Sequence, residues 1–353
     1  MVIARAPLRI SFAGGGTDLD AYYLNYGGLV VSTAITRYCY AIARPLASGG
    51  IQLTSADYRQ QETFPAGVLP DVCEPLALPK AAIEWFVNRG LLKRGVDLFL
   101  RSDVPPGTGL GSSSAMAVAI VRALAAYCEV DLDAETVAEI ACELEIKRLG
   151  MPIGKQDQYA SACGGLNAIH FEPDSVRVEA LTLPRNTLAE LDRRVLLFAT
   201  GTRHNSAEIL RGQRVDTDRK KPGVENALHQ IKAIAEELRV ALLAGQITEV
   251  GHLLDRGWQQ KKQLSTAISN SMIDHWYRIA REHGALGGKI VGAGGGGFLL
   301  LYCAPSRSES VRRALHRQGL CEMRFELEAL GARDVTDIEP SAAENEYLAQ
   351  LSH

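Results

Sequence analysis

The stretch PPGTGLGSSS at residues 105–114 decides the fold of this chain, because it joins a strand-like segment to a helical one. The run GVDLFLRS at 95–102 precedes it, and the apolar run AMAVAIVRALAAYC at 115–128 follows it. Its three glycines let bare backbone N–H groups approach an anion, and the first turn of a helix adds positive potential there. The pattern predicts either a tight serine-capped turn or a phosphate-binding loop. The three serines favour the loop.

Three familiar nucleotide-binding patterns do not fit. A Walker loop requires lysine after its last glycine, whereas Gly111 is followed by Ser112. A Rossmann fingerprint that starts at Gly107 needs glycine or alanine where Ser112 stands, and one that starts at Gly14 meets Leu19 instead. The H-R-D catalytic loop of protein kinases does not occur either. A phosphate site in this loop would therefore belong to another class.

Composition and charge narrow the class of protein. The 353 residues exceed the ~250 to 300 at which one hydrophobic core usually stops growing, so two domains are expected. A net charge of −3 gives no overall basic field for nucleic acid. Seven cysteines without a C-x-x-C pair indicate reduced thiols and a cytoplasmic location. The N-terminal MVIARAPLRISFAGGGTD resembles neither a signal peptide nor a membrane span, so no membrane partner is expected.

Periodicity along the chain predicts an α+β fold with two domains, 1–190 and 191–353. In the first, strands are expected at 2–13 and 28–44, and a helix at 133–149 is expected to be capped by its first residue, an Asp. The second is predicted to start on a strand and to continue mainly as helices. Its expected elements are a strand at 194–200, helices at 223–244, 247–263, 271–284 and 306–318, the strand-like stretch 289–303, and a short strand at 323–328.

One basic run in the second domain has no clear period. The residues RGQRVDTDRKK at 211–221 mix charges of both signs and carry one glycine. Loops on the surface of a protein tolerate such sequences and often cover binding sites. The run is therefore predicted to be a loop, with a lid as one role.

Three ordered motifs resemble those of the GHMP kinases, the family of galactokinase, homoserine kinase, mevalonate kinase and phosphomevalonate kinase. The family pattern P-x-x-x-G-L-G-S-S is matched by residues 105–113. Residues 6–9 with 14–18 are similar to the first family motif, and residues 289–297 to the third. The resemblance implies the family's two-lobe fold, with an N-terminal ribosomal protein S5 domain 2-like lobe and a C-terminal ferredoxin-like lobe. It also implies ATP and Mg²⁺ at the site.

The same resemblance implies roles for single residues. Ser113 and Glu145 would hold Mg²⁺, Asp157 would be the base or the group that orients the hydroxyl, and Arg9 would stabilise the transferring phosphoryl group. From the residues alone, Glu145 also fits a solvated helix face, Asp157 a helix N-cap, and Arg9 a surface ion pair. The residues implied to bind ATP are Pro106, Gly107, Gly109, Leu110, Gly111, Ser112, Ser113, Ser114, Gly294 and Gly295. The last two either cradle phosphates or let a strand pass close to the loop.

The acceptor is predicted to be a sugar. In galactokinase-like members, an Asp at the register of Asp18 binds sugar hydroxyls through charge-assisted hydrogen bonds. Gly15 and Gly16 stand where galactokinase has Glu-His. The floor of the pocket is therefore expected to be more open, and the substrate bulkier than galactose.

Further patterns narrow the sugar. Residues 14–18, 154–158 and 258–265 resemble the D-glycero-D-manno-heptose 7-phosphate kinases, which phosphorylate the anomeric oxygen of a sugar phosphate. Such a substrate requires cationic partners. Arg211, Lys261 and Lys262 are candidates, although adjacent lysines on a helix are usually solvent-exposed. The residues implied to contact the sugar phosphate are Gly15, Gly16, Thr17, Asp18, Lys155, Arg203 and His204.

Three other functions stay open on the sequence. An L-fucose kinase-like enzyme shares these motifs and the anomeric reaction but takes an unphosphorylated sugar. A regulator that senses ATP and sugar would keep the fold without turnover, although Arg9, Glu145 and Asp157 favour an enzyme. A decarboxylase of the mevalonate branch shares the fold, whereas the patterns at 14–18 and 154–157 favour sugars. A homodimer also stays open.

Overall fold

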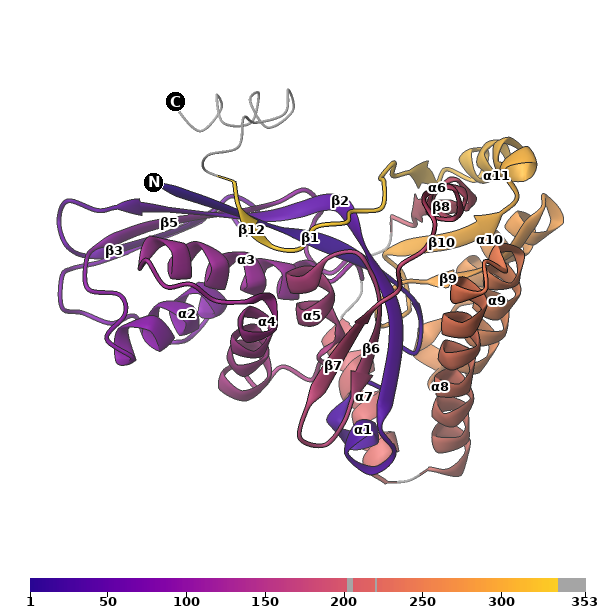
Figure 1. Ribbon diagram of the computed structural model, residues 1–353, viewed down its shortest axis with the longest axis horizontal. Helices are drawn as coiled ribbons and strands as arrows, with labels where there is room; N and C mark the ends of the chain where they lie inside the picture. Colours follow the sequence, from indigo (N-terminus) through magenta and orange to yellow (C-terminus); the bar gives the residue numbers. More distant parts are fainter. Residues whose placement is uncertain (202–205, 220, 336–353) are drawn as a thin grey trace.

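The computed structural model describes residues 1–201, 206–219 and 221–335, which form two lobes, each with its own sheet (Figure 1). The strands are β1 (Val2–Ala13), β2 (Gly28–Pro45), β3 (Ile51–Ser55), β4 (Gln60–Phe64), β5 (Val96–Ser102), β6 (Leu166–Phe171), β7 (Val176–Ala180), β8 (Val195–Ala199), β9 (Ala285–Ile290), β10 (Phe298–Cys303), β11 (Cys321–Glu322) and β12 (Arg333–Asp334). The helices are α1 (Asp20–Tyr26), α2 (Ala77–Asn88), α3 (Ser112–Tyr127), α4 (Ala134–Cys142), α5 (Gln156–Cys163), α6 (Arg185–Arg194), α7 (Ser206–Asp218), α8 (Pro222–Leu243), α9 (Ile247–Lys262), α10 (Ser271–Glu282) and α11 (Pro305–His316), with a π-helical turn at Glu143–Arg148 and a 3₁₀ turn at Thr266–Ile268. The predicted α+β fold is confirmed.

The first lobe contains a sheet with the strand order β12-β1-β2-β5-β3-β4, from which β6 and β7 branch at β2. The length of β2 makes this branching possible, because its first residues pair with β6 while its last residues pair with β5. Its β-branched and aromatic residues suit a strand that is buried over most of its length. The short β12 returns from the far end of the described chain to pair with β1. The boundary at 190 stays a prediction, and it would separate β12 from the sheet that β12 joins.

Helix α3 holds the loop 105–114 in place. It starts at Ser112, directly after Gly111, which has the left-handed φ of 75°. The helix is rich in alanine and buried on nearly all sides, and its small side chains let it lie close against β1 and β2. Helices α2, α4 and α5 lie on the same side of the sheet (Figure 1). The loop is therefore fixed between a buried strand and a buried helix.

The second lobe is built on an antiparallel sheet with the order β11-β8-β10-β9. Every residue of β10 is buried. Helix α9 packs on β9, while α8 packs on α9 and also reaches β2 of the first lobe. Val291, Phe298 and Leu300 belong to the same apolar cluster as the core of the first lobe. The shared core holds the glycine-rich turn between β9 and β10 against the first lobe.

The structure corrects the prediction of a loop at 211–221, because α7 covers most of this run. The buried face of α7 contains Ile209, Gln213 and Thr217, which follow each other at the four-residue spacing of a helix. Two of these three side chains are polar. Hydrophobic periodicity, which is the usual sequence signal for a helix, was therefore weak here.

Other local predictions need smaller corrections. The helix expected at 133–149 starts as predicted, with the carboxylate of Asp133 accepting from the N–H of Thr136 at 2.7 Å, but it continues from α4 into the π-helical turn. The stretch 289–303 is a hairpin rather than one strand, since its glycines form the turn between β9 and β10. Residues 323–328 form a single bridge, between Ile35 and Leu327, instead of a strand. Over the described ranges, no helix has the length and apolar character needed to span a membrane.

Candidate active site

A cavity of about 250 Å³ lies where the two lobes meet. It is lined by residues from the loop 105–114, the turn after β1, the start of α5, helices α7 and α9, and the turn after β9. Three of the lining residues are basic. A larger hollow of about 700 Å³ beside β6 and β7 is lined by three carboxylates and by no Lys or Arg. Like charges would repel an anion from that hollow. The smaller cavity is therefore the candidate site for a phosphate-bearing ligand.

Two glycine-rich turns, one from each lobe, touch at this cavity. A Cβ atom at Gly109 would lie 2.5 Å from the carbonyl oxygen of Val291, and one at Gly292 would lie 2.5 Å from the Cα of Gly109. Both glycines also have positive φ, 83° at Gly109 and 72° at Gly292. Only glycine satisfies both conditions. The backbone of the second lobe therefore passes close to the loop 105–114 at Gly292, before the glycines for which a close passage was predicted.

Most residues of the loop 105–114 that were predicted to bind ATP line the cavity. They are Gly107, Gly109, Gly111, Ser112, Ser113 and Ser114. The serines form the first turn of α3, where backbone N–H groups have no partner inside the helix. Pro106 and Leu110 are not among the lining residues, and Leu110 is buried with its carbonyl accepting from the backbone N–H of Arg9 at 3.2 Å. This end of the cavity has the donors that an anion requires.

The second glycine run contributes at other positions than predicted. Gly292 and Ala293 line the cavity. Gly294 instead packs against Ile268, because a Cβ there would lie 2.9 Å from the Cγ2 of that residue. The N–H of Gly295 donates to the carbonyl of Ile268 at 2.7 Å, so it is already paired. These two glycines stabilise the turn, and the two residues before them face the site.

Arg9 and Asp157 form a bidentate ion pair at the foot of the loop. The Nε and Nη2 atoms of Arg9 donate to the two carboxylate oxygens of Asp157, each at 2.7 Å, and Nη1 donates to the carbonyl of Gly109 at 2.7 Å. The Arg9 side chain is 5% exposed and that of Asp157 is 22% exposed. A planar guanidinium fixes a carboxylate in one orientation through two parallel bonds. Arg9 therefore positions Asp157 beside the loop.

Glu145 lies at the start of α3, and among the described residues its hydrogen-bond partners are neutral. Its Oε1 accepts from the hydroxyl of Ser113 at 2.7 Å, and its Oε2 accepts from the side-chain amide of Gln158 at 2.6 Å. The residue is fully buried. Burial raises the pKa of Glu145 to about 7, although the hydrogen bonds from Ser113 and Gln158 oppose this shift. The predicted pair of Ser113 and Glu145 is therefore assembled, and the interpretation of Glu145 as a solvated face is wrong.

Asp18 is a further buried carboxylate in the lining of the cavity. Its Oδ1 accepts from the N–H of Gly16 at 2.9 Å and its Oδ2 from the N–H of Gln156 at 3.3 Å. Burial raises the pKa of Asp18, and the negative charge of Asp157 raises it further, while its hydrogen bonds lower it. A Cβ at Gly154 would lie 1.9 Å from Asp18 Oδ2, so glycine is required there.

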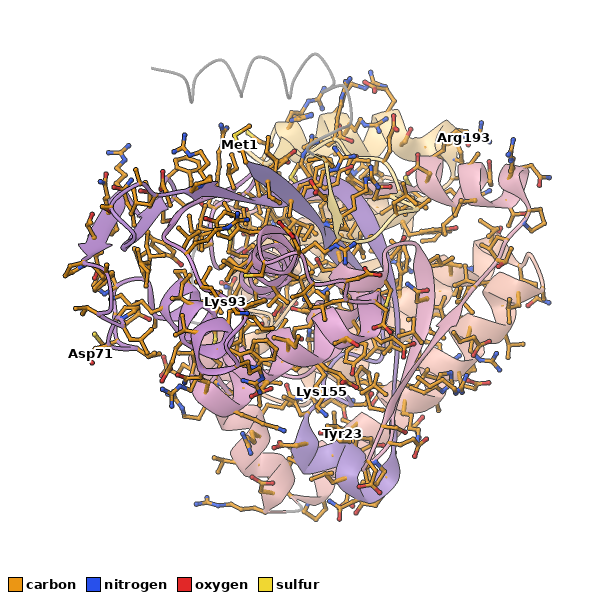
Figure 2. All side chains as sticks on the ribbon, turned by 60° about the vertical axis from the view of Figure 1, so that its left-hand side comes forward. Met1, Tyr23, Asp71, Lys93, Lys155 and Arg193 are labelled. Atoms are coloured by element: carbon orange, nitrogen blue, oxygen red, sulfur yellow. The ribbon has the colours of Figure 1, made fainter. Side chains whose placement is uncertain are left out.

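The remaining residues predicted to contact the substrate divide into three groups. Gly15 and Gly16 line the cavity. Thr17 is fully buried, and its hydroxyl closes the turn after β1 by donating to the carbonyl of Gly14 at 2.8 Å. Lys155 lies outside the lining, with its ammonium 5.1 Å from the centroid of the Tyr23 ring (Figure 2). Arg203 and His204 lie outside the described residues.

Two lysines line the cavity, and only Lys261 of the two was predicted from the sequence as a phosphate contact. Lys289 is 6% exposed and donates to the carbonyl of Phe12 at 3.2 Å, and Lys261 is 8% exposed and donates to the carbonyl of Gly292. Burial and the charge of Arg9 lower the pKa of Lys261 to about 8, and burial with the charges of Lys261 and Arg9 pushes the pKa of Lys289 well below its usual range. The position of Lys289 at the start of the third motif was the available signal.

The neighbouring Lys262 is not among the residues that line the cavity. Its ammonium lies 5.9 Å from the centroid of the Trp258 ring and 3.5 Å from a carboxylate oxygen of Asp274. Arg211, another candidate for a phosphate contact, is exposed on α7 and is not among the cavity residues. Of the adjacent lysines, Lys261 alone belongs to the cavity lining.

Comparison with known proteins gives matches over both lobes. The models for the GHMP kinases N terminal domain and the GHMP kinases C terminal domain match residues 77–165 and 238–320. A relative named D-glycero-alpha-D-manno-heptose 7-phosphate kinase, from Campylobacter jejuni, is 30% identical over 324 residues, which are 89% of this chain and 93% of that protein.

Two further proteins bear on the substrate. The crystal structure of a D-glycero-D-manno-heptose 1-phosphate kinase from Bacteroides thetaiotaomicron is 29% identical, with a TM-score of 0.79 over 95% of this chain and 98% of that one. An L-fucokinase/L-fucose-1-P guanylyltransferase from Bacteroides fragilis is 26% identical over 89% of this chain but only 36% of its own length. The similarity to the heptose enzymes thus extends over whole chains, and the similarity to the fucose enzyme over about a third of that protein.

Proposed function

This chain belongs to the GHMP kinases, and its similarity to the heptose phosphate kinases supports a kinase that acts on a sugar, so we propose that its acceptor is the anomeric hydroxyl of D-glycero-D-manno-heptose 7-phosphate. The product would be the 1,7-bisphosphate. The observation that carries this proposal is the ion pair of Arg9 with Asp157 at the loop 105–114, inside a cavity that also contains the buried Asp18. The heptose is supported by the 30% identity to the Campylobacter relative over 89% of this chain.

In the proposed reaction, the anomeric oxygen attacks the γ-phosphorus of ATP while the bond to the β–γ bridging oxygen breaks and ADP leaves. A carboxylate oxygen of Asp157 accepts the proton of the anomeric hydroxyl, and Arg9 keeps that carboxylate in place. The unpaired N–H groups at the start of α3 and the glycines of the loop hold the phosphates. Asp18 orients the sugar by accepting from its hydroxyls.

Mg²⁺ fits the pair of Ser113 and Glu145. Glu145 is fully buried beside the loop, has neutral hydrogen-bond donors, and has a pKa raised to about 7, so a cation would supply the missing countercharge. One carboxylate and one hydroxyl are a small set, which suits an ion that takes its remaining ligands from phosphate oxygens and water. Ser113 and Glu145 would hold the ion, which would neutralise charge on the ATP phosphates.

The buried cations of the cavity suit the transfer of a negatively charged phosphoryl group. The cavity lining contains Arg9, Lys261 and Lys289 against the carboxylates of Asp18 and Asp157. Two of these cations are lysines whose pKa is lowered by burial, and a phosphate oxygen beside them would stabilise their charged forms. In this proposal, Lys261 and Lys289 face the transferring phosphoryl group. The candidates for the contact with the 7-phosphate are Lys155 and the residues Arg203 and His204, which lie outside the described part of the chain.

A second candidate function is the phosphorylation of an unphosphorylated sugar such as fucose at the same position. It is supported by the 26% identity to the L-fucokinase relative over 89% of this chain. The neutral side chains around Gly15 and Gly16 would suit a sugar without a phosphate as well.

A screen of Mg·ATP-dependent ADP release separates these functions. The acceptors are heptose 7-phosphate, mannose, fucose, galactose and mevalonate, and the Asp157→Asn variant serves as the background. Turnover of heptose 7-phosphate with kcat/KM at least tenfold above the other acceptors supports the proposal. If only unphosphorylated sugars react, the heptose assignment is wrong. Binding of ATP and sugar without any ADP release would indicate a sensing regulator.

A further inference from the structure

Three buried polar atoms in the cavity have no hydrogen-bond partner among the residues that the structure describes. They are the hydroxyl of Ser11, the side-chain carbonyl oxygen of Gln156 and the side-chain amide nitrogen of Gln213. All three residues line the cavity, Ser11 from β1, Gln156 from the first turn of α5, and Gln213 from α7 of the second lobe. Ser11 is 4% exposed and Gln213 is 2% exposed. Native proteins leave few buried polar atoms unpaired, so three at one site point to a ligand that pairs with them.

The two consecutive glycines after β1 make room for these groups. A Cβ at Gly15 would lie 3.6 Å from Nε2 and 4.0 Å from Oε1 of Gln156, and 3.7 Å from the hydroxyl of Ser11. A Cβ at Gly16 would lie 2.5 Å from Nε2 of Gln213. The open floor that the sequence predicted at this pair is thus bordered by polar side chains, one of them from the opposite lobe.

The available atoms define what can bind. The amide nitrogen of Gln213 is a donor, the carbonyl oxygen of Gln156 is an acceptor, and the hydroxyl of Ser11 is both. The side-chain amide nitrogen of Gln156 donates a hydrogen bond to Asp18. Among the described residues, the side-chain carbonyl oxygen of Gln156 is therefore the atom left without a partner. A hydroxyl group donates and accepts at once, so neighbouring hydroxyls on one ring match a donor and an acceptor together.

We propose that Ser11, Gln156 and Gln213 form a hydroxyl-reading edge of the acceptor site, which selects a sugar with neighbouring free hydroxyls over an alcohol with one. The inference rests on the proposed function, because that function places the acceptor beside these three residues. It adds a specificity role for three residues, and it makes Gln213 the contribution of the second lobe to acceptor recognition. These residues bind the sugar, whereas Asp157 acts on the hydroxyl that reacts.

The test compares matched variants by ADP release with the best sugar acceptor of the screen. Gln213→Met keeps the volume and removes the donor, and Ser11→Ala removes the hydroxyl. Gln230→Met on the exposed side of α8 is the control for the first, and Ser32→Ala is the control for the second. Ser32 pairs across the sheet with Ser11 and also has a buried unpartnered hydroxyl, but it does not line the cavity. The first two variants should raise the sugar KM roughly tenfold with the ATP KM unchanged, and the controls should match wild type.

Singly deoxygenated sugars identify the contact. If Gln213 reads a hydroxyl, one deoxy analogue loses roughly ten- to a hundredfold in kcat/KM with wild type and much less with Gln213→Met, because the partner is already missing. Equal losses with both enzymes, or a parallel rise in the ATP KM, would mean that Gln213 is only structural and would overturn the inference.

The inference and the proposed function fail in different ways. Turnover of mevalonate with no sugar turnover would overturn the hydroxyl-reading edge while leaving a kinase. If no acceptor is turned over, the proposed function fails, and the edge is then tested by the rise in Tm that mannose or fucose produces. A rise in wild type and in Gln230→Met that is lost in Gln213→Met supports the edge. No rise in wild type overturns it.

Discussion

Two carboxylates, Glu145 and Asp157, flank the start of α3 and differ in what surrounds them. Asp157 is held by both arms of the Arg9 guanidinium at 2.7 Å and is 22% exposed. Glu145 is fully buried, and its partners are the hydroxyl of Ser113 and the amide of Gln158. Asp157 therefore has its countercharge built into the protein, whereas the pKa of Glu145 is raised to about 7 because its burial is not matched by a cation.

This difference separates the roles of the two groups. Two titratable groups whose environments differ in this way usually perform different tasks in one reaction. Asp157 is paired with a cation and fixed in direction, as a group that orients and deprotonates a hydroxyl needs to be. Under the proposed function, Glu145 would receive its countercharge from a bound cation. Each of the following predictions changes one side of the comparison.

The largest effect is expected for Asp157→Asn. The amide keeps the shape but cannot accept the hydroxyl proton, so kcat should fall by a factor of about 10³ or more with little change in the affinity for ATP. ADP release and a separate titration with ATP measure the two quantities. Asp174→Asn, in the exposed turn before β7, is the control and should behave like wild type. Turnover near the wild-type rate would remove Asp157 from the mechanism.

A smaller loss of activity is expected for Arg9→Lys, which keeps a positive charge beside Asp157 but loses the planar guanidinium. An ammonium cannot donate to both carboxylate oxygens and to the carbonyl of Gly109 in one fixed plane. The carboxylate should become mobile, and kcat should fall roughly a hundredfold.

A double variant distinguishes positioning from a purely structural role. If Arg9 acts through Asp157, Arg9→Lys should cost little further kcat once Asp157→Asn has removed the carboxylate, because residues that act as a unit have non-additive effects. Losses in kcat that simply multiply in the double variant would contradict the positioning role.

The sequence predicted the residues of this comparison but not the difference between them. The three motifs are local patterns, so the loop 105–114 and the residues matched to the family, Arg9, Asp157 and Ser113, could be identified from spacing and resemblance. Burial is not local. Glu145 stands between charged residues and fits a solvated face by helical periodicity, but it belongs to a π-helical turn, which does not keep that periodicity.

Residues from the second lobe were the hardest to predict for the same reason. Gln213 lies in a charged run that favoured a loop, and only its packing against the turn after β1 reveals it as a buried residue of the cavity. Lys289 and Lys261 come from different elements, and their proximity to Arg9 depends on how the two lobes meet. No sequence period encodes such a contact.

On the other side of the comparison, Glu145→Gln should raise the Mg²⁺ concentration needed for half-maximal activity by roughly tenfold, since an amide oxygen is a weaker ligand than a carboxylate. Glu143→Gln is a close control, because Glu143 starts the same π-helical turn but is 42% exposed and contacts Arg89 at 3.5 Å. It should leave the Mg²⁺ dependence unchanged. An unaltered Mg²⁺ requirement in Glu145→Gln would rule out the assignment of Glu145 as a ligand.

A further effect is expected in the stability of the protein without Mg²⁺ and nucleotide. The pKa of Glu145 is about 7 in the folded chain against a usual value of 4.5, so between these values the folded state holds a proton that the unfolded state has lost. Raising the pH through this window therefore lowers the free energy of unfolding, by about 3 kcal/mol for a shift of this size. The glutamine of Glu145→Gln does not titrate, so this variant should not lose stability through this window. The pKa of Lys261 is about 8, which keeps its own titration largely above the window.

Urea unfolding at several pH values between 4.5 and 7.5 measures this term as the difference between wild type and Glu145→Gln. The variant should gain stability relative to wild type as the pH rises, and Glu143→Gln should show no such trend. Mg·ATP should remove the trend, because an ion bound to the carboxylate holds it ionised at every pH of the series. A difference that stays constant with pH would show that Glu145 is already ionised at low pH in the folded chain, and the contrast with Asp157 would then rest on geometry alone.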